Sequence, residues 1–116
     1  MEADIKIIRS PVSKQVLKDS AKNLYGDFVK AVVDVEKGIM AIGSKFHADA
    51  EKMLLEDGSQ QQGLWGINLW VDKEKDWIEF NSMINIRPEA NNRTRGIESE
   101  EIKEKIRLVV GKLVLP

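Results

Sequence analysis

The segment Leu64-Trp65-Gly66-Ile67-Asn68-Leu69-Trp70-Val71 alternates between two kinds of side chain. That period of two predicts a β-strand with one apolar face and one mixed face. The apolar face, which we expect to contact the core, carries Trp65, Ile67, Leu69 and Val71. The mixed face carries Leu64, Gly66, Asn68 and Trp70.

A second alternating run, residues 77–87, follows a charged connection at 72–76. The two runs together predict a long antiparallel hairpin with one apolar face and one mixed face. If the protein has a binding site, we expect the mixed face of this hairpin to form its floor. That face would present Asn68, Trp70, Trp77, Asn85 and Arg87.

The rest of the chain adds further elements on both sides of this hairpin. We expect strands at 5–8, 28–35 and 39–42, and helices at 13–25, 46–56 and 99–113. Hairpins imply antiparallel pairing. The sequence therefore predicts an α+β fold: a mainly antiparallel sheet built from two hairpins plus an N-terminal strand, with three helices packed on one face. The strand order does not follow from these patterns.

Composition limits the class of protein. The 116 residues are 42% hydrophobic and 32% charged, which fits one globular domain spanning 1–116. The chain has no cysteine, so disulfides and thiolate metal sites are excluded. The acidic start at 1–4 lacks the layout of a signal peptide, and no apolar run is long enough for a membrane span. We expect a cytoplasmic protein.

Charge argues against polyanionic partners. The net charge is −1 and the pI is about 5.9. Nothing in that balance attracts nucleic acid or an anionic membrane surface. Any attraction for a small anion must be local.

Arginines gather in the polar segment 87–95. Three of the five arginines of the chain fall there, and a guanidinium grips carboxylate or phosphate with two parallel hydrogen bonds. This segment predicts an anion-binding loop. The alternative is an ordinary solvated loop whose arginines pair with nearby acids. The residues assigned to ligand binding here are Arg87, Asn91, Asn92, Arg93 and Arg95, with Asn68, Asn85 and Trp70 from the hairpin.

His47 is the only histidine of the chain. On a helix it would share a face with Glu51, and the two residues could make a metal site or an acid–base pair. Asp49 lies between them but points elsewhere or caps the helix. The spacing lacks the second histidine of a zinc helix, so we assign no metal site and no cofactor. The alternative is a structural histidine bonded to a neighbouring carboxylate.

The three tryptophans admit two roles. Trp65 belongs to the apolar face, whereas Trp70 and Trp77 are expected to be cross-strand neighbours on the mixed face. Such a pair could form a homodimer interface. Stacking on nucleic acid is disfavoured by the acidic pI.

Several motifs resemble one family. They are Tyr-Gly-Asp-Phe-Val-Lys-Ala-Val-Val-Asp-Val-Glu (25–36), His-Ala-Asp-Ala-Glu (47–51), Leu-Leu-Glu-Asp-Gly-Ser (54–59), Leu-Trp-Gly-Ile-Asn (64–68), Ile-Asn-Ile-Arg-Pro (84–88) and Asn-Arg-Thr-Arg (92–95). The chain resembles a family of small uncharacterised prokaryotic proteins, catalogued as a domain of unknown function. The resemblance implies a prokaryotic, soluble, single-domain protein and brings no activity or catalytic residue.

Three functional hypotheses follow. The leading one is a small intracellular domain that binds a phosphate- or carboxylate-bearing ligand between the 87–95 loop and the mixed face. The second is a small enzyme acting on a phosphorylated or nucleotide-like substrate, with His47 as acid or base. The third is a homodimeric interaction module. Signatures of the common nucleotide-binding and hydrolase classes are missing from the sequence.

Overall fold

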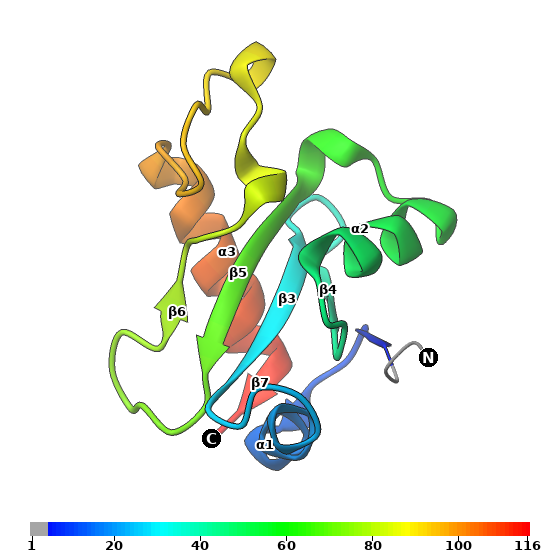
Figure 1. Ribbon diagram of the computed structural model, residues 1–116, viewed down its shortest axis with the longest axis vertical. Helices are drawn as coiled ribbons and strands as arrows, with labels where there is room; N and C mark the ends of the chain where they lie inside the picture. The colour runs from blue at the N-terminus through cyan, green and yellow to red at the C-terminus, as the bar shows by residue number, and fades with distance from the viewer. Residues whose placement is uncertain (1–4) are drawn as a thin grey trace.

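A computed structural model describes residues 5–116 and places a five-stranded sheet at the centre of the molecule (Figure 1). Its strand order is β1-β4-β3-β5-β6, and every neighbouring pair is antiparallel. The fold is α+β, with an N-terminal strand at one edge, as the sequence predicts. The strands of the sheet are β1 (Lys6–Ile8), β3 (Phe28–Asp34), β4 (Ile39–Ile42), β5 (Leu64–Trp70) and β6 (Ile78–Glu79). A separate parallel pair joins β2 (Val12–Ser13) to β7 (Val114–Leu115).

Strands β3 and β5 form the longest pairing in the sheet. It runs from Phe28 opposite Trp70 to Asp34 opposite Leu64. The predicted alternation of β5 is confirmed, because all the side chains of its apolar face are buried in the main core. They are Trp65, Ile67, Leu69 and Val71, the last just beyond the strand.

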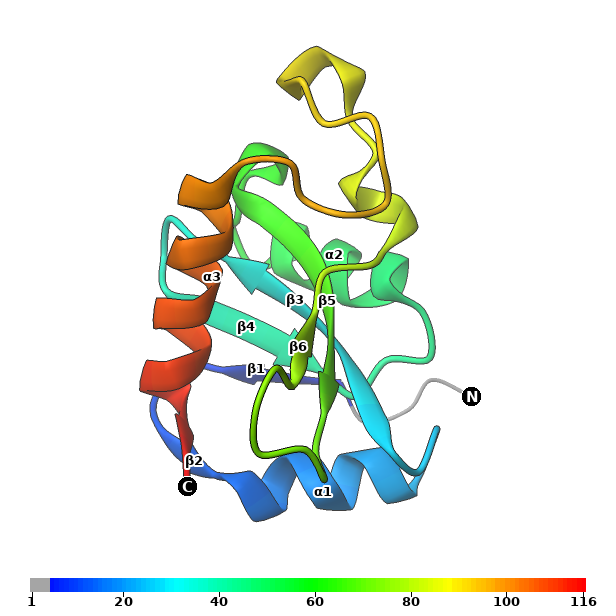
Figure 2. The ribbon, with the colours of Figure 1, turned by 90° about the vertical axis from the view of Figure 1, so that its left-hand side faces the viewer.

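The helices cover both faces of the sheet (Figure 2). Helices α1 (Lys14–Lys22) and α3 (Glu100–Leu113) contribute to the main core. Helix α2 (His47–Glu56) packs on the opposite face, where Ala50 and Leu54 join a second cluster. The sequence predicts all three helices on one face. The difference arises because β3, β4 and β5 also carry buried apolar side chains on their second face, and these side chains need cover of their own. The strand residues of the second cluster are Val32, Ile39, Ala41 and Leu64.

The predicted second strand of the central hairpin is short. Only Ile78–Glu79 pairs with β5, after which the chain turns through the 3₁₀ segment η2 (Met83–Asn85). Gly66 permits this departure, because a Cβ there would lie 2.5 Å from the side chain of Ser82. The side-chain amide of Asn85 then takes the place of a strand. Its Oδ1 accepts from the Gly66 N–H at 2.8 Å, and its Nδ2 donates to the Gly66 carbonyl at 2.9 Å.

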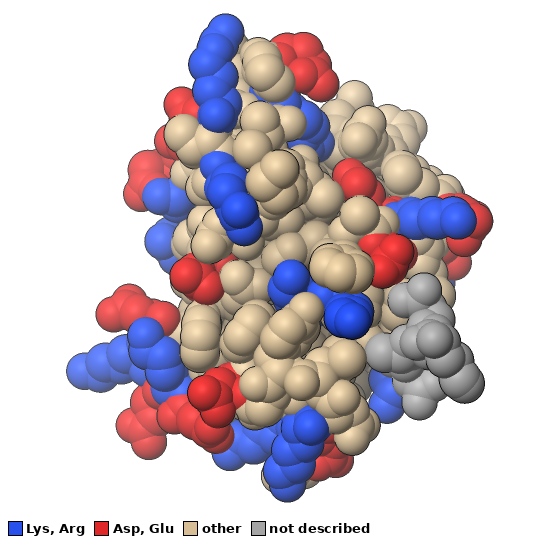
Figure 3. Space-filling view, in the orientation of Figure 1, with Lys and Arg blue, Asp and Glu red and all other residues tan. Residues whose placement is uncertain are grey.

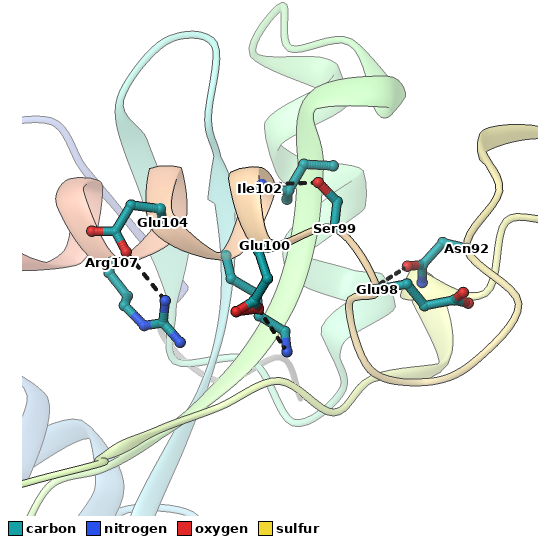
Figure 4. A network of polar contacts seen from close by, with 8 residues as sticks. Asn92, Glu98, Ser99, Glu100, Ile102, Glu104 and Arg107 are labelled. Carbon is teal, nitrogen blue, oxygen red and sulfur yellow. Dashed lines mark hydrogen bonds and ion pairs between the residues drawn. The ribbon is translucent and has the colours of Figure 1, made fainter.

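The loop that follows is held from inside by one asparagine. Nδ2 of Asn92 donates to the carbonyls of Asn85, Thr94 and Gly96, and its Oδ1 accepts from the Glu98 N–H. Figure 4 shows that last contact beside the start of α3, where the Ser99 hydroxyl accepts from the Ile102 N–H. The loop also contains η3 (Pro88–Ala90). The backbone of this loop is therefore held by hydrogen bonds within the protein.

None of the helices in residues 5–116 has both the length and the apolarity that crossing a membrane requires.

Candidate functional site

A cleft of about 560 Å³ lies over the outer face of β3 and β5. One wall is the beginning of α2, and the other is the segment 81–84 together with Arg95. The face of the sheet on which α2 packs is turned toward the viewer in Figure 1. Figure 3 shows this face as largely uncharged, with basic side chains near its middle and acidic side chains close to them. The predicted mixed face of β5 thus lines the cleft with Asn68 and Trp70.

An aromatic row forms one end of the floor. Phe28 lies opposite Trp70 in the β3–β5 pairing, and their ring centroids are 4.7 Å apart. Tyr25 stacks on Phe28, again with 4.7 Å between centroids. Phe28 and Trp70 line the cleft, and aromatic side chains of this kind contact planar ligands.

A polar row lies next to the aromatic one. Asn68 is opposite Lys30 on one side and opposite Glu79 on the other. Cross-strand partners lie close together, so a cation, an amide and a carboxylate stand side by side across three strands. The row continues the alternation of β3, in which Phe28 and Lys30 share a face.

Asn68 is buried, with 7% of its surface exposed. Only one of the two polar atoms of its side-chain amide has a hydrogen-bond partner. Nδ2 donates to Oε1 of Glu79 at 3.0 Å and reaches the Asn81 carbonyl at 3.4 Å. Oδ1 has no hydrogen-bond partner within residues 5–116. A buried carbonyl without a donor is costly, so this atom stands out as an unfilled acceptor.

Glu79 is anchored by two donors. Its Oε1 accepts from Asn68 and also from the indole Nε1–H of Trp70 at 3.1 Å. The carboxylate thereby orients the amide and the indole that line the cleft.

His47 lies at the start of α2 with 8% of its surface exposed. Its Nε2 is 2.8 Å from the carbonyl of Ile67, on the floor strand. The pKa of the imidazole is lowered from 6.5 to about 4, chiefly by burial, with the nearby charges of Lys30 and Arg95 acting in the same direction. The bond to Ile67 and the Asn68 side chain act in the opposite direction. The imidazole is therefore neutral at pH 7, with Nε2 donating to Ile67 and Nδ1 carrying no proton.

Arg95 reaches the cleft from the 87–95 loop. Its backbone carbonyl accepts from the Ser82 N–H at 2.9 Å and from Nδ2 of Asn85 at 3.0 Å. Its Nε donates to Oδ1 of Asn81 at 2.9 Å, which orients the guanidinium. The side chain stays exposed, and it makes no ion pair with the described residues.

The first turn of α2 adds main-chain donors. Phe46 occupies the N-cap position and has no side-chain acceptor, so no side chain caps the first N–H groups of the helix. Phe46, His47 and Ala48 all line the cleft. An uncapped helix N-terminus favours negative charge nearby.

Four of the residues assigned from sequence meet in this cleft: His47, Asn68, Trp70 and Arg95. The approach of His47 to one of the loop arginines could not be read from the sequence. The remaining assigned residues do not line it. They are Glu51, Asn85, Arg87, Asn91, Asn92 and Arg93.

Arg87 turns inward. Its guanidinium donates to the backbone carbonyls of Gln61 (2.6 Å) and Leu64, and it lies 4.0 Å from the ring centroid of Trp65. Burial lowers the pKa of Arg87, while Glu51 and Glu89 act to raise it. This arginine is buried and stabilises the start of β5, so it is not available to a ligand.

Three of the loop residues shape the backbone instead of lining the cleft. The side-chain amides of Asn85 and Asn92 form hydrogen bonds with main-chain groups, as described above. Asn91 is exposed and takes the left-handed conformation that ends η3, with φ of 59°. Asparagine tolerates that conformation better than most residues do.

Two further assignments are separated from the cleft. Arg93 is exposed, and its backbone N–H donates to Glu98. Glu51, one turn after His47, lies near Gln61 Nε2 at 3.5 Å. Asp49 lines a different surface depression, beside Ile5. Across the described residues, no group of three His, Asp or Glu side chains is placed to hold a metal ion.

The tryptophans divide between core and cleft. Trp65 is buried, and the Trp70 N–H donates to the Trp77 carbonyl, so these two are cross-strand neighbours. The Trp77 ring packs against the main core, with Nζ of Lys14 4.6 Å from its centroid.

Sequence reasoning missed the other nine residues that line the cleft. They are Phe28, Lys30, Phe46, Ala48, Glu79, Asn81, Ser82, Met83 and Ile84. The alternation of β3 places Phe28 and Lys30 on one face, but only the pairing with β5 brings that face beside Asn68. Lysines are spread along the chain, so Lys30 carries no signal of its own.

A family model described as "Protein of unknown function (DUF5674)" matches residues 6–113. Comparison with curated proteins gave no match, and neither did comparison with solved structures.

Proposed function

This chain belongs to the DUF5674 family of proteins of unknown function, and we propose that it binds a small organic anion in the cleft over β3 and β5. The ligand would carry a carboxylate or a phosphate. The observation that carries this proposal is the pair of cations, Lys30 and Arg95, which face one cleft without an acidic partner in the described structure.

The two cations are held on opposite sides of the cleft. Lys30 rises from β3, where its Nζ lies 5.2 Å from the Tyr25 ring centroid and 5.6 Å from that of Phe46. Arg95 is oriented by Asn81 from the far wall. A carboxylate or phosphate between them would gain charge-assisted hydrogen bonds from both.

The polarity of the remaining groups supports a ligand that is more than an inorganic ion. Apolar side chains contribute most of the other surface, from Phe28, Phe46, Trp70 and Met83. Small-molecule sites combine such a lining with a few polar groups that fix orientation. Here those groups are Asn68, His47 and the start of α2.

The enzyme hypothesis draws on the same geometry, since His47 and Arg95 share the cleft. A general base works best when its pKa lies near the working pH. With a pKa of about 4, His47 is a weak base at neutral pH. Binding is therefore the better supported function. The homodimer hypothesis has less support, because the Trp77 ring packs against the core.

The setting of the protein belongs to the same proposal. The motifs that resemble small prokaryotic proteins, and the absence of cysteine, favour a cytoplasmic protein of a prokaryote.

The proposal is tested by isothermal titration calorimetry with benzoate and with phenyl phosphate. Replacement Arg95→Ala should weaken the binding of the better probe about tenfold, because a charge-assisted hydrogen bond is lost. Arg93→Ala is the matched control, two residues away on the same loop but outside the cleft. Equal affinity for the unmodified chain and both variants would contradict the proposal.

A further inference from the structure

The Asn68 amide has a fixed orientation. Its Nδ2 faces the Glu79 carboxylate and the Asn81 carbonyl, both of which accept hydrogen bonds only. Turning the amide over would place its oxygen against these acceptors. Oδ1 is therefore an acceptor by necessity, and it is the one that is buried without a donor.

His47 adds a second acceptor to the same cleft. Nε2 is engaged with the Ile67 carbonyl, so the neutral ring presents Nδ1 as a lone pair. The contact of the Asn68 side chain acts to raise the pKa of the ring, which is the effect of an acceptor, so Oδ1 faces the imidazole. Between them, the two side chains bring two acceptors and no donor to the floor.

The apolar walls restrict the rest of the ligand. Phe46 and Met83 are 56% and 63% exposed, unusual values for large apolar side chains, and both line the cleft. They come from opposite walls, one next to α2 and the other in η2. Phe28 and Trp70 lie on the floor between them. A flat apolar body would cover these side chains together.

Building on the proposed anion-binding function, we infer that the ligand is a small aromatic carboxylate or phosphate that also carries a hydrogen-bond donor, which it gives to Asn68 Oδ1. The aromatic ring contacts Phe28 and Trp70. The anion lies toward Lys30 and Arg95. The donor of the ligand forms the hydrogen bond that Oδ1 of Asn68 lacks. The cleft therefore selects ligands by this donor as well as by their charge.

Matched probes test this inference on the unmodified chain. The 2-, 3- and 4-aminobenzoates are compared with the corresponding methylbenzoates, because an amino group and a methyl group are similar in size and differ in the donor. Filling a buried acceptor should make the best aminobenzoate bind about tenfold more tightly than its methyl counterpart. The same comparison with aminophenyl and methylphenyl phosphates distinguishes a carboxylate ligand from a phosphate ligand.

Substitution Asn68→Ala assigns the effect to one side chain. The preference for the amino compound over the methyl compound should fall below about twofold in this variant, whatever its affinity for either compound. Cooperative urea unfolding checks separately that the variant is folded. Asn23→Ala, at an exposed position outside the cleft, should leave the preference unchanged.

The outcomes separate the two proposals. Equal binding of amino and methyl compounds overturns the donor inference and leaves anion binding intact. Binding of neither class by the unmodified chain overturns both. A preference for the amino compound that persists in Asn68→Ala overturns the assignment to Asn68. Equally tight binding of saturated aminocyclohexanecarboxylates overturns the aromatic requirement.

Discussion

The side-chain amide of Asn85 pairs with both backbone groups of Gly66, in the position where the next strand of the sheet would otherwise lie. This pairing ends the hairpin early. It also turns the chain over β5, so that Asn81 and Arg95 form a wall of the cleft. The cleft therefore depends on a structural asparagine that does not line it.

Replacement Asn85→Ala should destabilise the protein by about 3 kcal/mol, because it leaves buried backbone groups of Gly66 and Arg95 without partners. Urea unfolding followed by tryptophan fluorescence measures the change. Asn23→Ala, at an exposed site, serves as the control. A loss of less than about 0.5 kcal/mol, the range typical of surface substitutions, would refute this role.

Replacement Arg87→Lys should cost about 2 kcal/mol of stability although it conserves the charge, because buried carbonyls lose their donors. A lysine ammonium cannot reproduce the planar fork that joins two carbonyls while stacking on Trp65. Ligand affinity should stay unchanged, since Arg87 lies outside the cleft. Chemical denaturation and calorimetry measure the two effects, and a variant that is as stable as the original but binds poorly would contradict the assignment.

The lowered pKa of His47 predicts a pH dependence of stability. The folded chain holds this imidazole neutral down to about pH 4, whereas the unfolded chain protonates it near 6.5. Between these values the unfolded state binds more protons, so stability is full above pH 6.5 and falls as the pH drops toward 4. The loss attributable to this group is about 3 kcal/mol.

Denaturation curves at several pH values test this prediction, with His47→Gln as the comparison. The difference in stability between the original chain and the variant should shrink on acidification from pH 7 to 4. A difference that is independent of pH would show that burial does not perturb His47.

The sequence predicted the framework well where side-chain periodicity is strong. The apolar face of β5, the hairpin of β3 and β4, and the Ser99-capped start of α3 follow local patterns. It did not predict that β6 would be short. Residues 78–86 alternate like a strand, but Gly66 and Asn85 replace the pairing with a side-chain contact across 19 positions.

The site residues were predicted only in part, again because contacts between residues far apart in the sequence decide which side chains meet. Residue type indicated an arginine-rich loop, and Arg95 does face the cleft. Residue type could not predict which guanidinium turns inward. Arg87 does so because it stacks on Trp65 and donates to two backbone carbonyls. Lys30 became a site residue only through its position opposite Asn68, which depends on strand order.

The central claim is that the cleft over β3 and β5 binds an organic anion. A titration of ¹⁵N-labelled protein with benzoate, followed by two-dimensional NMR, tests it most directly. The account predicts saturable shifts of the Lys30, Asn68 and Arg95 amide signals and of the Trp70 indole signal, with Asn91 and Arg93 unaffected. An absence of saturable shifts, or shifts confined to Asn91 and Arg93, would contradict it.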